Sequence, residues 1–436
     1  MIRLSPRTTK GLWSRVLGAV MVIGGLLAVA RASAPPARSP EPPPGMVAPY
    51  RYAPSRGRVA DAEVAFYKRR LRQHPNSGPD HALLAAAYLR QARATMEPAW
   101  YLLAEKEARA SLSHQPFDNP GAVLALAQVA EARHDFSEAI AMARRTRVRG
   151  AVPPEALTIA ANANLALGRV PEAADAARTL VKQAPSTGAY TALAQSLLAQ
   201  GKDGEALDAF QQALLREEPG EQESSAWLRG LLARHHLRRG RLTLAEEVNR
   251  QALRARPEYP LALFLMGEIA ARRGLWEEAE RQYEAAYRQA PLPAYLMAQA
   301  RARAARGDRA GAEALWARAE GMVREQMAKG ASAHRRDLAR LLLARGRPQE
   351  VEEALRYARG EALMRRDAET LDTLAWALFA AGKPAQARTI LLEALRFGVR
   401  DARLRLRLSE VEARLGNSEA AARERTRARE IDPLEI

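Results

Sequence analysis

The sequence predicts an all-α fold, a solenoid of about nine to ten helical hairpins that repeat along the chain. Three regularities support this prediction: an alanine that recurs about every 34 residues, a small residue twelve positions before it, and a glycine between the two. A period of this length is typical of architectures in which short helical units stack on one another. The recurring alanines are Ala139, Ala173, Ala206, Ala245, Ala279, Ala312, Ala354, Ala387 and Ala421.

Each repeat is interpreted as two helices joined by a tight turn. Two helices approach closely only where small side chains face each other, which explains the alanine and the small residue before it. The glycine stands five residues before most of the alanines, where the first helix has to end with a positive φ. Prolines twelve residues after an alanine should end the second helix, because proline cannot continue a helical hydrogen-bond ladder. The expected turn residues are His134, Gly168, Gly201, Gly240, Gly274, Gly307, Gly346, Gly382 and Gly416, and the expected helix-ending prolines are Pro185, Pro257, Pro291 and Pro433.

Three irregularities interrupt the period. Ala354 stands eight residues after Gly346, so the register of the seventh repeat is left open. Insertions at Glu217–Ser225 and Glu320–Ala333 should emerge as loops or lengthened helix ends. The first insertion is acidic, and its four glutamates could repel acidic ligands or could form a surface loop without a role: Glu217, Glu218, Glu221 and Glu223.

The pattern resembles the tetratricopeptide repeat, and the segment Pro260–Pro291 is the clearest copy. The resemblance covers Asn119 to Pro433, with a looser pair of helices before it, and it implies a right-handed α-solenoid that binds other proteins. The segment Leu371–Ala387 also resembles bacterial exported repeat proteins, which brings no activity with it. The residues that carry the resemblance in the clearest copy are Leu263, Met266, Gly267, Trp276, Ala279, Tyr283, Ala286 and Pro291.

Residues 1–34 predict a signal peptide or an N-terminal membrane anchor. Basic residues precede the apolar run Val16–Ala30, which ends in small residues. A run of this length suits a cleaved signal with cleavage after Ala32, since a spanning helix needs about 20 residues. The alternative is an uncleaved segment, residues 11–34, anchored in the cytoplasmic membrane. Both of these interpretations make the protein exported, with its repeats in the periplasm or elsewhere outside the cytoplasm, because the basic end stays inside. A third alternative is a cytoplasmic protein with an apolar N-terminus.

The rest of the chain divides into three parts. Residues 35–60 are predicted to be a proline-rich linker, with eight prolines between Ala34 and Asp61. Residues 61–118 should hold N-terminal capping helices and a divergent repeat, and residues 119–436 the solenoid. Stacked repeats grow without a single core, so we expect one elongated domain from about residue 61 onward.

The formal net charge is +17, carried mainly by arginine. A basic solenoid favours a protein or peptide partner of acidic character, and no nucleic acid is expected for an exported protein. One alternative is a binder of anionic envelope polymers or lipid headgroups. Another is that arginine simply covers solvated helix faces, since several clusters contain interleaved Glu or Asp.

No pattern typical of catalysis was found. The absence of cysteine excludes disulfides, thiolate catalysis and cysteine-ligated zinc. The sequence also lacks HExxH, P-loop and nucleophile-elbow motifs, so we expect no enzymatic activity, no cofactor and no metal site. His235 and His236 diverge by about 100° on a helix, and we expect one to be buried and the other exposed.

The resemblance implies a concave groove, into which the position after the small residue of each first helix normally points. The chain has mostly polar side chains there, and an extended peptide needs such groups because its backbone amides must be satisfied. An aromatic and acidic pocket could be supplied by four side chains, Phe264, Trp376, Phe379 and Asp372. The alternative is that the groove is polar because it is wet, and that Trp376 packs between repeats. The residues expected to bind the partner of this scaffold or assembly factor are Asn162, Gln195, Arg234, Glu268, Arg301, Arg336, Arg340, Asp372 and Trp376.

Overall fold

The computed structural model describes residues 59–95, 99–147, 151–328 and 334–434, which lie in one compact unit, Val47–Ile436. The predicted signal or anchor and nearly all of the proline-rich linker lie outside the described residues. None of the described helices is both long and apolar enough to cross a membrane. The described part of the chain is helical, apart from its connections and an isolated bridge residue, Ala151.

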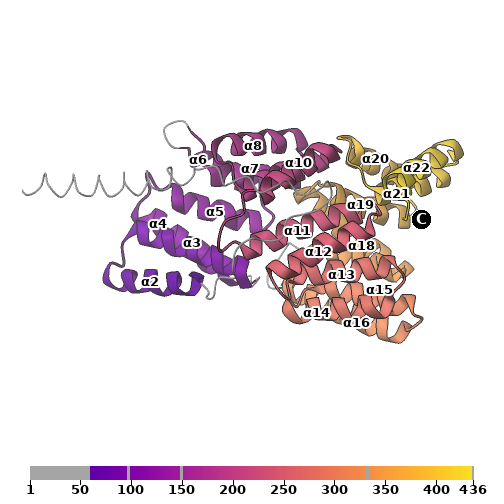
Figure 1. The fold of residues 1–436 in the computed structure, drawn as a ribbon, viewed down its shortest axis with the longest axis horizontal. Helices are drawn as coiled ribbons and strands as arrows, with labels where there is room; N and C mark the ends of the chain where they lie inside the picture. The colour runs from indigo at the N-terminus through magenta and orange to yellow at the C-terminus, as the bar shows by residue number, and fades with distance from the viewer. Residues whose placement is uncertain (1–58, 96–98, 148–150, 329–333, 435–436) are drawn as a thin grey trace, which may run out of the picture. The chain divides into compact units, whose positions relative to one another are not determined.

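Ten helical hairpins follow the first described helix, α2 (Val59–Gln73), as Figure 1 shows. The prediction of an α-solenoid of about nine to ten hairpins is therefore confirmed. The hairpins pair α3 (Gly78–Thr95) with α4 (Ala99–His114), α5 (Pro120–Ala132) with α6 (Phe136–Arg145), α7 (Pro154–Ala166) with α8 (Val170–Gln183), α9 (Thr187–Ala199) with α10 (Asp203–Leu214), α11 (Gln222–Leu237) with α12 (Leu242–Ala255), α13 (Pro260–Arg272) with α14 (Trp276–Gln289), α15 (Pro293–Ala305) with α16 (Arg309–Ala328), α17 (Arg335–Arg345) with α18 (Val351–Met364), α19 (Ala368–Ala380) with α20 (Pro384–Leu395), and α21 (Ala402–Arg414) with α22 (Ser418–Ile431).

The turns form where the sequence predicted them. All eight predicted turn glycines have positive φ, and His134 takes the same conformation, with φ of 63°, in the hairpin α5–α6. The predicted prolines also follow the ends of second helices; α14, for example, ends at Gln289, two residues before Pro291. Local backbone preferences therefore account for the hairpin boundaries.

Small residues lie where the two helices of a hairpin touch. Ala161 and Ala173, which belong to α7 and α8, have no exposed surface. In the hairpin α13–α14 the contact is tighter still, because a Cβ added at Gly267 would lie 2.5 Å from Cε1 of Tyr283. Buried apolar side chains form several clusters along the described hairpins, as expected for stacked repeats.

The structure resolves the register of the seventh repeat. A short 3₁₀ helix, η2 (Pro348–Glu350), lies between the left-handed residue Gly346 and the start of α18. Its three residues account for the longer distance from Gly346 to Ala354. Arg340 therefore lies on α17, the first helix of its hairpin.

The two insertions differ from each other. The second lengthens α16, which runs for 20 residues to Ala328, and its remainder lies outside the described residues. The first forms the connection to α11, but Glu217 does not present its charge to solvent. Its carboxylate is buried and accepts hydrogen bonds from Arg229, so the expectation that it repels acidic ligands is wrong for this residue.

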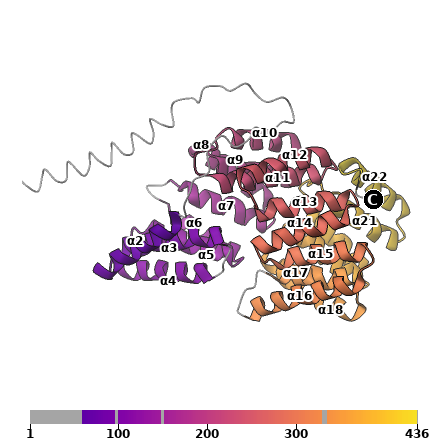
Figure 2. The ribbon, with the colours of Figure 1, turned by 60° about the horizontal axis from the view of Figure 1, so that its bottom comes forward.

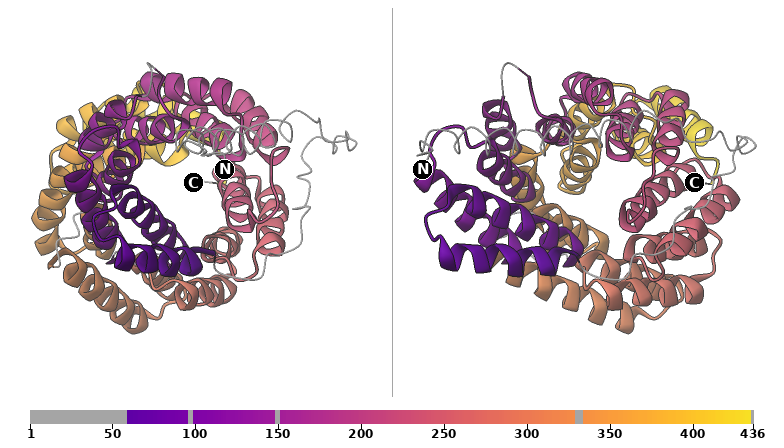
Figure 3. Two further views of the ribbon diagram at one scale, coloured as in Figure 1. Left: turned by 90° about the vertical axis from the view of Figure 1, so that its left-hand side faces the viewer. Right: turned by 60° about the vertical axis from the view of Figure 1, so that its left-hand side comes forward.

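Contacts between distant hairpins depart from the expectation of an elongated domain in which each repeat touches only its neighbours. We call α7–α12 the early hairpins and α17–α22 the late hairpins. The chain winds round so that the two groups meet, which can be followed in Figures 2 and 3. The backbone N–H of Arg366 donates a hydrogen bond of 2.7 Å to the carbonyl of Ala166, and a Cβ added at Gly240 would lie 2.7 Å from a carboxylate oxygen of Asp432.

The contacts between early and late hairpins follow one regular offset along the chain. The turn of α7–α8 meets the connection between α18 and α19, the turn of α9–α10 meets the connection between α20 and α21, and the turn of α11–α12 meets the residues after α22. Each early turn thus packs against the end of the hairpin five positions later. At the second of these contacts a Cβ added to Gly201 would overlap the carbonyl oxygen of Gly398, so the two backbones touch directly.

Candidate partner-binding cleft

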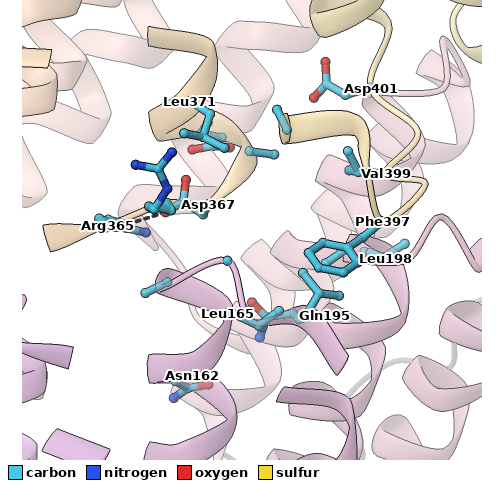
Figure 4. A pocket seen from close by; sticks show the side chains of 18 of the residues that line it. Asn162, Leu165, Gln195, Leu198, Arg365, Asp367, Leu371, Phe397, Val399 and Asp401 are labelled. Atoms are coloured by element: carbon cyan, nitrogen blue, oxygen red, sulfur yellow. Dashed lines mark hydrogen bonds and ion pairs between the residues drawn. The ribbon is translucent and has the colours of Figure 1, made fainter. Parts of the chain in front are cut away.

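A cleft of about 580 Å³ lies between the early and the late hairpins (Figure 4). One wall is built by the first helices α7, α9 and α11, which contribute Asn162, Gln195 and Arg234. Each of these residues follows a buried alanine that faces the second helix of its own hairpin. Because consecutive residues on a helix point about 100° apart, the polar side chain is turned from the hairpin contact toward the cleft.

The facing wall is built by the connections on either side of the hairpin α19–α20. Asp367 is the N-cap of α19, where its carboxylate accepts a 2.9 Å hydrogen bond from the N–H of Thr370. This cap places Glu369 in the first turn of the helix, at the edge of the cleft. Phe397 and Asp401 come from the connection that follows α20 (Figure 4).

Three of the nine predicted residues, Asn162, Gln195 and Arg234, line this cleft together. Arg336 and Arg340, on α17, approach Glu369 without lining the cleft. A nitrogen of Arg336 lies 3.7 Å from a carboxylate oxygen of Glu369. Five of the expected side chains are therefore grouped around one inner region of the described chain.

Glu268 and Arg301 bind each other elsewhere. Their side chains lie 3.3 Å apart, and the hydroxyl of Tyr283 donates a 2.6 Å hydrogen bond to Glu268. These two residues belong to α13 and α15 and do not line the cleft.

Asp372 and Trp376 are both engaged by Arg407 of the next hairpin. The guanidinium of Arg407 lies 2.6 Å from the Asp372 carboxylate and 4.9 Å from the centre of the Trp376 ring. This is the arrangement of the alternative in which Trp376 packs between repeats. Phe264 instead packs against Tyr283 and Tyr295, with ring centres 5.5 and 5.3 Å away, in a different cluster from Trp376 and Phe379. The four-residue pocket is thus not formed.

Sequence reasoning missed Glu369 and Arg238, which form an ion pair across the cleft. The two residues are 131 positions apart and occupy no repeat position that the groove pattern uses. The sequence signals this pair only by the opposite charges of the two residues, and the chain contains many residues of either charge. Two residues so far apart in the sequence come together only through the way in which the stacked hairpins wind.

The electrostatics of the inner region centre on Glu369. Arg238 above all, with Arg336, Arg340 and Arg234, holds the pKa of the Glu369 carboxyl well below its ordinary value. Burial, together with the neighbouring positive charge of Arg238, lowers the pKa of Arg234. Among the described residues neither Arg234 nor Arg340 has an ion-pair or hydrogen-bond partner. The region can therefore accept further negative charge.

Glu131 lies in the same cleft and is affected in the opposite direction. Burial raises the pKa of Glu131 to about 7, although a hydrogen bond from Asn162 and the charge of Arg93 oppose the change. Between pH 4.5 and pH 7 the folded chain therefore keeps a proton that the unfolded chain releases. Stability falls as the pH rises through this interval.

Glu131→Gln is expected to raise the free energy of unfolding by about 1–3 kcal/mol at pH 8 and to change it little at pH 5. Glutamine carries no charge, so the variant avoids the cost of ionising a buried carboxyl. Urea unfolding followed by circular dichroism at the two pH values measures this difference. Glu172→Gln, which replaces an exposed glutamate, is the control and should shift the urea midpoint by the same amount at pH 5 and at pH 8. A shift for Glu131→Gln that is equal at the two pH values would contradict the prediction.

His235 and His236 are both buried, each 5% exposed, so the expectation of one exposed histidine is wrong. His235 lies near Arg239 and near Asp203 of the preceding hairpin, and the two imidazoles pack against each other with ring centres 5.4 Å apart. Burial, with the charge of Arg239, lowers the pKa of His235 to about 3. Burial and Arg241 lower that of His236 to about 4. In the described part of the chain no group of three acidic or histidine side chains is placed to hold a metal ion.

Comparison with known proteins places this geometry in a wider group. The family model of the tetratricopeptide repeat matches residues 124–187, 191–260, 231–292 and 373–435. No curated protein sequence matches the chain. Among solved structures, the human IFIT1 dimer with PPP-AAAA is 16% identical, with 84% of this chain and 94% of that chain covered and a TM-score of 0.45. Yeast Tom70 is 11% identical, with 85% and 88% covered and a TM-score of 0.38.

Proposed function

The chain belongs to the tetratricopeptide repeat family, and from this membership we propose that it is a non-catalytic scaffold that binds a partner protein in the cleft described above. The partner contributes an extended segment of acidic character. The scaffold acts outside the cytoplasm, delivered there by residues 1–34 and held at the membrane if that segment remains. The observation that carries the proposal is the alignment of Asn162, Gln195 and Arg234 from successive first helices along one wall of one cleft.

The chemistry of that wall suits an extended peptide. Amide side chains both donate and accept hydrogen bonds, so Asn162 and Gln195 can satisfy the N–H and C=O groups of a backbone in the cleft. Arg234 adds a guanidinium, whose planar set of N–H donors matches a carboxylate. The repeat spacing presents these groups in a row, which favours a segment without secondary structure of its own.

The second candidate function is binding of anionic envelope polymers or lipid headgroups, and the net charge of +17 favours it. The two candidates differ in their response to salt. Binding through the whole basic surface weakens steeply as ionic strength rises, whereas cleft binding depends on particular side chains.

Arg234→Glu is expected to weaken binding of acidic peptides by about tenfold or more, because it places a like charge where a carboxylate binds. The measurement uses an array of ten-residue peptides containing Glu or Asp, with Gln and Asn versions of each peptide. Arg254→Glu is the matched control, since Arg254 is exposed on α12 of the same hairpin. Equal loss in the two variants would favour the polyanion function, and no loss in either would refute the cleft as the binding site.

A further inference from the structure

The connection between α18 and α19 and the first two residues of α19, together residues 365–369, already occupy part of the cleft wall that a partner would use. The N–H of Arg366 donates a hydrogen bond of 2.7 Å to the carbonyl of Ala166 at the end of α7. A Cβ added at Gly168 would lie 2.7 Å from the carbonyl oxygen of Arg366. The 365–369 segment therefore packs backbone to backbone on the early hairpins, as an extended ligand would.

The segment also brings a carboxylate to the arginines of the cleft. Glu369 forms an ion pair with Arg238, one turn after Arg234 on α11, and lies within the field of Arg234 itself. Arg336 lies 3.7 Å away on the other side, and Arg340 lies within the field of the same carboxylate. Glu369 thus lies among four guanidinium groups. Arg336 also lies 3.6 Å from Asp367, whereas Arg234 and Arg340 have no ion-pair or hydrogen-bond partner among the described residues.

The ion pair that holds the segment is open to water. The side chains of Arg238 and Glu369 are 34% and 37% exposed. Water and a ligand can therefore reach the pair, and a ligand that offers several carboxylates can compete with Glu369 for the same guanidinium groups. The early and late hairpins also meet at two neighbouring contacts, of Gly201 with Gly398 and of Gly240 with Asp432.

We propose that the 365–369 segment is an internal competitor of the partner: Glu369 takes the place of a partner carboxylate, and an acidic segment enters the cleft by displacing it. This inference rests on the proposed function of the cleft. The early and late hairpins then exchange between a closed state, held by Glu369 and by the contacts between turns, and an open state that binds. The apparent affinity of the partner is reduced by the fraction of molecules in the closed state.

The first test removes the competing carboxylate from the full-length chain. A fluorescein-labelled peptide of ten glutamates is the probe, and a ten-glutamine peptide is its uncharged control. Glu369→Gln is expected to bind the glutamate probe about fivefold more tightly than the unaltered chain, as measured by fluorescence anisotropy. Glu419→Gln, whose carboxylate is 95% exposed on α22, removes the same charge elsewhere and should leave the affinity unchanged.

The second test opens the contact between turns without substituting any charged residue. Gly201→Ala places a Cβ against the carbonyl of Gly398, while Gly274→Ala introduces the same residue at a φ of 74°, against 71° for Gly201, with nothing within 4 Å. The two variants therefore carry a similar backbone cost, and only the first disturbs the contact. Gly201→Ala should bind the probe more tightly than Gly274→Ala.

A distance measurement distinguishes separation of the early and late hairpins from other causes of tighter probe binding. Because the chain has no cysteine, spin labels can be placed at Glu172→Cys on α8 and Leu392→Cys on α20, both of which are exposed. Electron–electron double resonance should show a longer distance in Gly201→Ala and in the presence of the probe. Gly274→Ala should keep the distance of the unaltered chain.

The outcomes are distinguishable. If Glu369→Gln binds the glutamate probe no more tightly than the unaltered chain, while Arg234→Glu still binds it more weakly, the 365–369 segment is not a competitor. The proposed function of the cleft then stands. If the probe binds no variant, or if Arg234→Glu has no effect, the cleft function fails and this inference fails with it. If Gly201→Ala does not fold, the Glu369→Gln comparison decides alone, since that variant leaves the backbone contact intact.

Discussion

Arg229→Ala is expected to lower the free energy of unfolding by about 3–5 kcal/mol, a large loss for a single substitution. The side chain of Arg229 is 0% exposed, and that of its partner Glu217 is 5% exposed. Arg229 Nη2 donates a 3.1 Å hydrogen bond to Glu217, and Nη1 contacts the hydroxyl of Ser225. Removing the guanidinium leaves a buried carboxylate without its counter-charge, which is the main cost.

Urea unfolding followed by circular dichroism measures this effect, with Arg281→Ala as the control. Arg281 pairs with Glu278 on the surface, where the side chains are 67% and 39% exposed, so its removal should cost less than about 0.5 kcal/mol. The double variant Arg229→Met with Glu217→Leu replaces both charges by apolar groups and should regain most of the loss. A shift in Arg229→Ala no larger than in Arg281→Ala would mean that the buried pair is not formed.

Acidification from pH 6.5 to pH 4 is expected to destabilise the protein through His235 and His236 by about 3–6 kcal/mol in all. Both imidazoles are buried and have their pKa lowered, to about 3 for His235 and about 4 for His236. The unfolded chain therefore takes up two protons below pH 6.5 that the folded chain does not accept. The stability that these residues contribute is present above pH 6.5 and is lost as the pH falls, opposite in sign to the effect of Glu131.

The double variant His235→Gln with His236→Gln should flatten this part of the profile, because glutamine does not titrate. The measurement is the midpoint of thermal unfolding at pH 7, 5.5 and 4. His74→Gln, which replaces an exposed histidine, is the control and should keep the slope of the unaltered chain. An unchanged slope in the double variant would show that other groups cause the acid sensitivity.

Most of the fold could be predicted, because the information that defines a hairpin is local. The turn glycines, the small pairs such as Ala161 with Ala173, and the helix-ending prolines all act within one repeat. The candidate site was only partly predictable for the same reason. Asn162, Gln195 and Arg234 share one repeat position and were found, whereas the ion pair of Arg238 with Glu369 follows no period.

The repeating pattern of the sequence predicted the helical hairpins and most of their boundaries, apart from the seventh repeat, and it indicated which face of the first helices is polar. The contact of the turn at Gly201 with Gly398, and the position of Glu369 among the arginines of the early hairpins, are visible in the tertiary structure alone. The reason is geometric. Each hairpin is rotated a little relative to the one before, and the sum of these rotations over five hairpins brings distant segments into contact. No single repeat contains that sum, so no local pattern of residues reveals it.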